Sequence, residues 1–280
     1  MREIECGAIA DAVERLCIEA NYCLPGDVKA RFAEAVTTEK SPLGRNVLET
    51  LIENAETAAR DGYPMCQDTG VLVAFVEIGQ DARITGGWIE DAINEGVRRG
   101  YEKGFLRKSV VADPIRRENT GDNTPAVIYY EIVPGDGLKI TVAPKGFGSE
   151  NMSALRMLTP SDGLEAVKNF VTETAVNVGP NACPPVILGV GLGGTMEKAA
   201  LLAKKALLRS VDERHPDPFW AGVEAELCGR INKTGIGPGG LGGTTTCLGV
   251  SIEVYPTHIA GLPVAVNISC HAARHAAARL

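Results

Sequence analysis

Residues 64–78 read PMCQDTGVLVAFVEI, in which a turn that contains a cysteine runs directly into a largely apolar segment. The apolar part, 71–78, is rich in β-branched side chains, which is typical of a buried β-strand. Apolar residues at helical spacing over 47–55 predict a helix before the turn, and Gly62 is a typical helix-ending residue. The turn therefore joins a helix to a strand, and Cys66 lies where that strand begins.

Outward from this turn, helices and strands continue in both directions. We expect helices within 4–60, over 88–103 and 163–177, and from Thr195 to about 209, and strands over 126–133, 138–143, 186–193, 248–254 and 263–268. The polar segment 107–125 predicts a long loop, and such loops in compact domains tend to be functional. Pro134-Gly135-Asp136-Gly137 predicts a hairpin between its two flanking strands.

This order of elements predicts a mixed α/β fold. We expect one domain over 1–280, in which a helical N-terminal subregion (1–62) packs on the small mixed sheet of an α/β region (63–280).

The composition narrows the function. With 45% hydrophobic and 22% charged residues the chain has ordinary globular usage. It has neither an apolar run of the roughly 20 residues that a membrane helix needs nor an N-terminal signal pattern, so we expect a soluble, cytoplasmic protein without a membrane partner. A net charge of −7 and 5% aromatic residues argue against nucleic-acid binding.

The eight cysteines are the most informative residues. Four in predicted helices are expected to be small buried hydrophobes: Cys6, Cys17, Cys23 and Cys228. The other four lie among turn-forming residues: Cys66, Cys183, Cys247 and Cys270. Cys66 and Cys183 each precede a strand and Cys270 follows one, at separations of 117 and 87 residues that only a fold can bring together. Cysteine thiolates are the usual ligands of iron–sulfur clusters, although core thiols beside turns are equally compatible with this spacing.

Six groups of residues, in chain order, carry a family resemblance. They are Cys66-Gln67-Asp68-Thr69-Gly70, Asn119-Thr120-Gly121, Lys145-Gly146-Phe147-Gly148-Ser149, Ala182-Cys183-Pro184-Pro185, Gly193-Gly194-Thr195, and His258 with Ser269-Cys270. The ordered set resembles the N-terminal, cluster-binding half of class I fumarases and the related tartrate dehydratases. The resemblance runs from about residue 43 to the end of the chain.

The resemblance implies a [4Fe–4S] cluster held by Cys66, Cys183 and Cys270. One iron would then have no protein ligand and would act as a Lewis acid. Cys247 has no counterpart among the family's ligands, and we expect it to be structural.

The same resemblance implies roles for residues beside these cysteines. Gln67 and Asp68 would contact the substrate, with Asp68 donating or accepting a proton, although an aspartate before Thr69-Gly70 also suits a turn cap. Arg107 would bind a substrate carboxylate through its planar guanidinium, the alternative being a solvated loop charge.

Two glycines and a histidine complete the implied site. Gly146 and Gly148 would let backbone N–H groups approach an anion closely, or simply form turns. His258 precedes Cys270 by twelve residues, as in the resembling fumarases, which implies a catalytic role in place of a structural one.

The implied activity is reversible hydration of fumarate to (S)-malate. Single-chain fumarases continue into a second domain, whereas this sequence stops ten residues after Cys270. We therefore expect the α subunit of an α2β2 enzyme whose β subunit supplies the base and further cations for the small dicarboxylate. Two alternatives stay open: the α subunit of a tartrate dehydratase, and a cluster-carrying regulatory or scaffold subunit without turnover.

Overall fold

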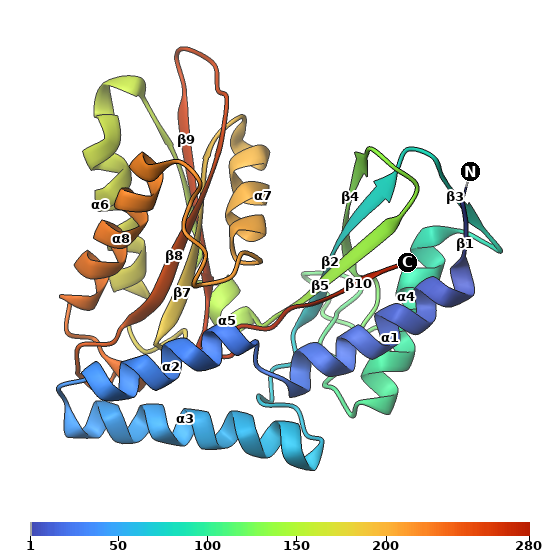
Figure 1. Cartoon of the computed structure of the whole chain (residues 1–280), viewed down its shortest axis with the longest axis horizontal. Helices are drawn as coiled ribbons and strands as arrows, with labels where there is room; N and C mark the ends of the chain where they lie inside the picture. The colour runs from blue at the N-terminus through green and yellow to red at the C-terminus, as the bar shows by residue number, and fades with distance from the viewer. Residues whose placement is uncertain (1) are drawn as a thin grey trace. The chain divides into compact units, whose positions relative to one another are not determined.

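The computed structural model describes residues 2–280, and the chain divides into two compact units (Figure 1). The first unit contains the residues up to Leu24, Asn54–Gly146 and Arg274–Leu280, and the second contains Pro25–Glu53 and Phe147–Ala273. Each unit has a four-stranded mixed sheet with helices, which confirms the mixed α/β fold class. That the chain acts as one domain stays a prediction. Within residues 2–280 no helix is long and apolar enough to cross a bilayer.

The elements of the two units are as follows. The first unit holds β1 (Arg2–Glu5), α1 (Cys6–Tyr22), β2 (Val71–Gly79), β3 (Ala82–Thr85), α4 (Ile89–Lys103), β4 (Val127–Val133), β5 (Leu138–Lys145) and β10 (Ala276–Arg279). The second holds α2 (Gly26–Thr38), α5 (Phe147–Glu150), β6 (Ala154–Leu158), α6 (Gly163–Val178), β7 (Val186–Gly193), α7 (Met196–Ala206), α8 (Pro218–Asn232), β8 (Cys247–Tyr255) and β9 (Leu262–Ser269). Helix α3 (Pro42–Asp61) is divided between them.

The hairpin predicted at 134–137 is wrong. The sheet order in the first unit is β10-β5-β2-β4, so β2 lies between the two strands that were expected to pair. Strand β4 is parallel to β2 and β5 is antiparallel to it, and the connection wraps around the end of β2, where Asp81 N donates to Gly135 O at 2.9 Å. A Cβ atom at Gly79 would lie 2.5 Å from Gly135 O, so this passage requires a glycine. The Pro-Gly-Asp-Gly segment does reverse the chain direction, but it connects β4 to β5 across the end of β2, which lies between them.

Helices α1 and α4 pack closely together in the first unit. A Cβ atom at Gly96 would lie 2.6 Å from Ala10 O, and one at Gly100 would lie 2.8 Å from Cys17 Cβ. These glycines let the two helix backbones approach each other, and both helices contribute to one core with alternate residues of β2, such as Leu72.

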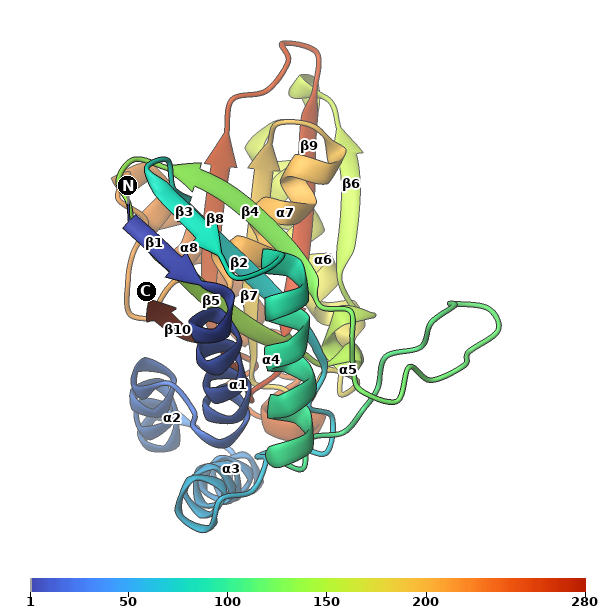
Figure 2. The ribbon, with the colours of Figure 1, turned by 90° about the vertical axis from the view of Figure 1, so that its right-hand side faces the viewer.

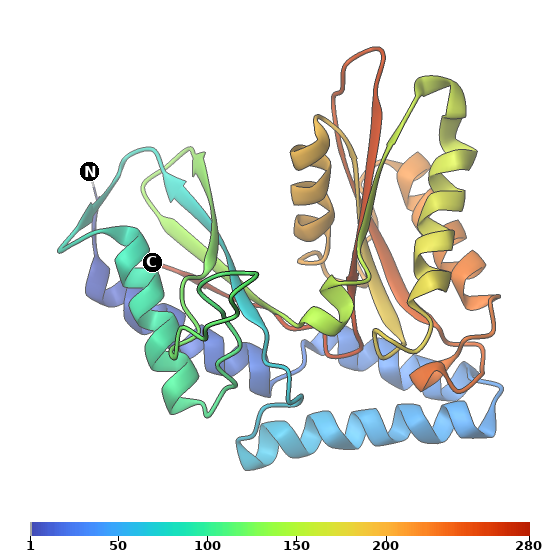
Figure 3. The ribbon, with the colours of Figure 1, turned by 180° about the vertical axis from the view of Figure 1, so that it is seen from behind.

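The second unit has three layers, which Figure 3 shows edge-on: α7 covers one face of its sheet, and α6 and α8 cover the other. The sheet order is β6-β9-β7-β8. Strand β7 reads VILGVGLG, and its large residues such as Leu188 and Val190 pack with α6 and α8. On the opposite face, a Cβ atom at Gly189 or Gly191 would lie 2.0 Å from a carbonyl oxygen of α7. The alternation of large residues and glycines along β7 thus determines which helices pack on each of its two faces.

Glu39, between α2 and α3, fixes the glycine- and threonine-rich loop that precedes β8. Its side chain is buried (1% exposed) and accepts hydrogen bonds from the backbone N–H groups of Ser41 (2.8 Å), Thr244 (2.9 Å) and Thr245 (2.7 Å). Burial alone would raise the pKa of Glu39, but these hydrogen bonds lower it to about 2. The ionised carboxylate therefore stabilises this part of the second unit.

We predict that Glu39→Gln lowers the free energy of unfolding at pH 7 by about 2–3 kcal/mol. The pKa of Glu39 is lower in the folded chain than the value of about 4.3 in an unfolded chain. Its stabilisation is therefore complete above about pH 4.3 and is lost as the pH falls toward about 2. Urea unfolding of both proteins at pH 7 and pH 3 measures this, and the difference should shrink at the lower pH.

Glu34→Gln is the matched control, because this exposed α2 glutamate pairs only with Arg31 at the surface and should cost less than about 1 kcal/mol. A pH-independent difference for Glu39→Gln would contradict the assigned role.

Candidate functional site

Four segments of the first unit meet at one end of its sheet. The turn that contains Gln67 and Asp68 precedes β2, and Gly146 follows β5, which is antiparallel to β2 with Val71 opposite Lys145. Asn123 lies before β4, which is parallel to β2, and Arg274 lies before β10, which is antiparallel to β5. This strand pairing therefore brings residues that are far apart in the sequence to one end of the sheet.

Asp68 caps its own turn. Its Oδ1 accepts a hydrogen bond from Gly70 N at 3.0 Å, and its backbone carbonyl accepts one from Arg274 Nη1 at 2.6 Å. A Cβ atom at Gly146 would lie 2.9 Å from Asp68 Oδ2 and 3.1 Å from Arg274 Nη2, so a side chain there would displace these two groups. The carboxylate is half-buried. The turn-capping interpretation is therefore correct, and it occupies one carboxylate oxygen.

A buried network fixes both this turn and the start of the long loop. Tyr101 OH lies 2.9 Å from Thr69 O and 3.0 Å from Gly70 O, and burial raises the pKa of Tyr101 well above its usual range. Thr69 Oγ1 accepts a hydrogen bond from Arg107 N at 2.9 Å. The Arg107 backbone is thus held directly by the turn that carries Asp68.

Asn123 extends this network. Its Nδ2 donates to Gly70 O at 3.1 Å, and its Oδ1 accepts from Ser109 N at 2.6 Å and Val110 N at 3.2 Å. The residue is fully buried and adopts φ +63°, a left-handed conformation that asparagine tolerates better than most residues.

Arg107 is positioned but exposed. Its guanidinium has no hydrogen-bond or ion-pair partner anywhere in residues 2–280, whereas its backbone is fixed by Thr69. It lies at the start of the predicted long loop 107–125, which Figure 2 shows extending well beyond α4. A guanidinium with a fixed backbone and open donors suits binding of a carboxylate.

Two of the three predicted cluster ligands lie together in the second unit. Cys183 precedes β7, and Cys270 directly follows β9, which is antiparallel to β7 with Ile187 opposite Ser269. The carbonyl of Cys183 lies 3.0 Å from His271 Nδ1, and it accepts a hydrogen bond from His271 N. The antiparallel pairing therefore brings the two cysteines to the same end of the sheet.

Exposure alone does not separate the predicted ligands from the other cysteines. Cys183 and Cys23 are exposed, Cys66, Cys270 and Cys228 are half-buried, and Cys6, Cys17 and Cys247 are buried. The expectation that Cys23 and Cys228 are buried is therefore wrong. Three partly accessible thiols are a donor set that suits iron. Cys66 belongs to the first unit and the other two to the second. Within residues 2–280, no three His, Cys, Asp or Glu side chains gather into a metal site.

His258 does not lie with Cys183 and Cys270. It is exposed in the loop between β8 and β9, and the eight residues of β9 separate it from Cys270 by roughly 26 Å at about 3.3 Å per residue. His258 instead lines a cavity of about 440 Å³ with Gly194 and Thr195, from another of the quoted groups. Its catalytic role stays a prediction. The sequence groups that carry the family resemblance in the second unit thus lie at both ends of its sheet, and not at one.

The two predicted glycines differ. Gly146 makes the close approach to Asp68, whereas a Cβ atom at Gly148 would meet only Asn181 O at an ordinary 3.7 Å.

The sequence analysis did not predict a role for Tyr101, Asn123 or Arg274, which hold the turn that contains Asp68. Asn123 follows the quoted Asn119-Thr120-Gly121 group by two residues and Arg274 follows Cys270 by four, so closeness to these groups was the available signal.

The comparisons with known proteins agree with this geometry. The family described as Fumarate hydratase (Fumerase) matches residues 10–279, and the chain belongs to this family of hydro-lyases. It is 45% identical over 278 residues to the "Putative L(+)-tartrate dehydratase subunit alpha" of Methanocaldococcus jannaschii, covering 97% of each chain. It is 35% identical over 254 residues to the L(+)-tartrate dehydratase subunit alpha of Escherichia coli K12, covering 90% of this chain and 84% of the relative.

We predict that Asn123→Ala costs about 2 kcal/mol of stability, because it removes the acceptor of two partly buried N–H groups and one of the two donors to the buried carbonyl of Gly70. It should also raise the rate of proteolytic cleavage within 107–125 several-fold. Chemical denaturation and limited proteolysis measure the two effects.

Asn123→Asp keeps the acceptor for Ser109 and Val110 but places a buried carboxylate oxygen against the carbonyl of Gly70, so it should lower stability as well. Equal cleavage rates in the wild-type and Ala proteins would show that Asn123 does not anchor the loop.

Proposed function

We propose that this chain is the α subunit of an iron–sulfur hydro-lyase that removes water from a four-carbon hydroxy-dicarboxylate, with L(+)-tartrate as the favoured substrate. The observation that carries the proposal is the pair Cys183 and Cys270, which lie at one end of one sheet in a chain of the fumarase family. The names of the relatives favour tartrate over the fumarate and (S)-malate expected from the sequence.

The proposed cofactor is a [4Fe–4S] cluster held by Cys66, Cys183 and Cys270. With three protein ligands, the cluster supplies one iron as a Lewis acid for a substrate hydroxyl. The partial exposure of all three thiols supports this ligand set, and the burial of Cys17 and Cys247 argues against theirs.

The residues of the first unit bind substrate and move a proton in this proposal. The Arg107 guanidinium donates two parallel hydrogen bonds to one substrate carboxylate. Gln67, exposed beside Cys66, contacts the same substrate. Asp68, whose Oδ1 remains bonded to Gly70 N, protonates the departing hydroxyl, and Gly146 lets the backbone after β5 approach this carboxylate closely.

A β subunit completes the proposed enzyme. The relatives carry the designation subunit alpha. A dicarboxylate has two charged ends, and one arginine matches the geometry of only one of them. The partner would supply cations for the second carboxylate and the base that takes the proton from carbon 3, in an α2β2 assembly.

The ligand set makes a direct prediction. Replacing Cys66, Cys183 or Cys270 by Ser should each remove most of the iron and the visible absorbance of anaerobically purified protein, because serine is a poor ligand for such a cluster. Cys17→Ser and Cys23→Ser, one buried and one exposed, are the matched controls and should keep full iron content. Iron retained in Cys270→Ser but lost in Cys247→Ser would overturn the assignment.

The substrate is tested with the chain co-expressed with its β subunit. We expect kcat/KM for L(+)-tartrate dehydration to exceed that for (S)-malate by at least about tenfold, measured as formation of a 2-oxo acid and of fumarate. A preference for malate would support fumarate hydratase instead. Full iron content without turnover of either would support a non-catalytic cluster-carrying subunit.

Arg107→Lys serves as the substrate-binding variant in the same assay. It keeps the charge but loses the planar fork, and kcat/KM should fall by roughly thirtyfold, which corresponds to about 2 kcal/mol, at unchanged iron content. Arg117→Lys, an exposed position in the same loop, is the control and should not change kcat/KM.

A further inference from the structure

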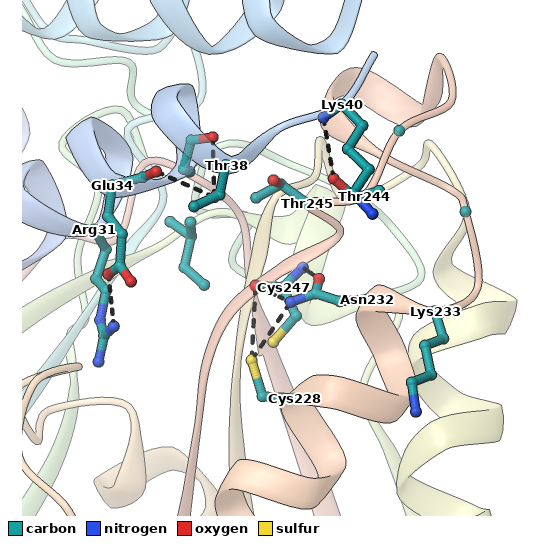
Figure 4. A pocket seen from close by; sticks show the side chains of 14 residues that line it. Arg31, Glu34, Thr38, Lys40, Cys228, Asn232, Lys233, Thr244, Thr245 and Cys247 are labelled. Carbon is teal, nitrogen blue, oxygen red and sulfur yellow. Dashed lines mark hydrogen bonds and ion pairs between the residues drawn. The ribbon is translucent and has the colours of Figure 1, made fainter.

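Two cysteines with no part in the proposed reaction line a cavity of about 530 Å³ within the second unit (Figure 4). The cavity lies between α2, the end of α8 and the loop before β8. Cys228 and Asn232 come from α8, and Thr245 and Cys247 from the loop and the first residue of β8. Cys228 also lines a second cavity of about 290 Å³. Cys228 therefore borders both cavities.

The two thiols face each other, as Figure 4 shows. Cys228 Sγ lies 3.7 Å from the backbone carbonyl of Cys247. Asn232 fixes this arrangement, because its Oδ1 accepts from Cys247 N at 2.8 Å while its Nδ2 donates to Cys247 O at 3.1 Å and lies 3.7 Å from Cys228 Sγ. The backbone of Cys247 is thus tied to the helix that carries Cys228.

The pair is chemically asymmetric. The neighbouring Cys247 thiol lowers the pKa of Cys228, burial opposes this effect, and the positive charges of Arg31 and Arg214 lower the pKa further. The pKa of Cys247, whose thiol donates to Gly249 O at 3.3 Å, is raised by the neighbouring Cys228 thiol and by burial. Cys228 is half-buried and Cys247 is 2% exposed. The accessible sulfur is therefore also the one that more readily becomes a thiolate, which is the nucleophilic form.

We propose that Cys228 and Cys247 form a peroxide-sensitive thiol pair that closes to an intrachain disulfide between α8 and β8. The Cys228 thiolate attacks one oxygen of hydrogen peroxide, the O–O bond breaks, and hydroxide leaves, so that Cys228 becomes a sulfenic acid. The Cys247 sulfur then attacks the Cys228 sulfur, the S–S bond forms, the S–O bond breaks, and the hydroxyl leaves as water with the Cys247 proton. The two thiols together lose two electrons to the peroxide, which ends as two water molecules.

This inference does not depend on the hydro-lyase activity, because neither sulfur belongs to the proposed cluster ligands. The remaining cysteines supply internal comparisons. Cys17 is buried with its pKa raised by burial, so it should resist oxidation, and Cys23 is exposed, so it reports the reactivity of an ordinary surface thiol.

The test treats the anaerobically purified full chain with hydrogen peroxide at one to ten equivalents, blocks remaining thiols by alkylation, and maps cysteine-containing peptides by mass spectrometry. We expect a Cys228–Cys247 crosslinked peptide that a dithiol reductant reverses and that forms at least about tenfold faster than Cys23 is oxidised. Crosslinks confined to Cys66, Cys183 and Cys270, or over-oxidised Cys228 without a crosslink, would overturn the proposal.

Two variants separate the steps. Cys247→Ser should accumulate a sulfenic acid at Cys228 that a 1,3-dione traps, and Cys228→Ser should leave Cys247 reduced. Cys17→Ser is the control and should form the crosslink at the wild-type rate. Oxidation of Cys247 in Cys228→Ser at the wild-type rate would contradict the assigned order. If a variant fails to fold, the peptide map of the wild-type chain decides the proposal by itself.

Discussion

The antiparallel pairing of β7 with β9 is the constraint on which the candidate site of the second unit depends. Because Ile187 lies opposite Ser269, the segment before β7 and the segment after β9 emerge at the same end of the sheet, and Cys183 and Cys270 come with them. The same register sends the β8–β9 loop to the other end, and His258 with it. One strand pairing therefore decides which of the quoted residues share a site, although they are scattered over almost ninety positions of sequence.

That pairing is stable because β7 can be covered on both faces. Its large residues pack against α6 and α8, and its glycines admit α7 at backbone contact, where any side chain would collide with helix carbonyl oxygens. Strand β7 lies between β9 and β8, and its register is strongly specified because a slip of one residue would exchange its two buried faces. In β7 such a slip would drive Leu188 or Val190 into the α7 backbone.

The sequence was sufficient to predict individual helices and strands, but it did not predict which strands lie next to one another in a sheet. The strand at 71–78, the helix ending at Gly62 and the helices at 88–103 and 163–177 are confirmed, because each depends on local periodicity and terminal signals. The hairpin at 134–137 was wrong because turn composition is local, whereas the insertion of β2 between β4 and β5 depends on contacts some 60 residues away. The twelve-residue interval between His258 and Cys270 does not mean that the two residues are close in space, because the extended strand β9 lies between them and places them at opposite ends of the sheet.

The two interpretations of Asp68 that the sequence left open are compatible in the structure. Its Oδ1 caps Gly70, which fixes χ angles and removes the freedom that a solvated carboxylate would have. Its Oδ2 lies close to Gly146, where a Cβ atom would be 2.9 Å away from it. Arg274, Tyr101 and Asn123 then hold the surrounding backbone from three different segments. A turn cap of this kind is also a means of orientation: an acid whose direction is set by its own turn and by its neighbours loses little entropy when a substrate arrives.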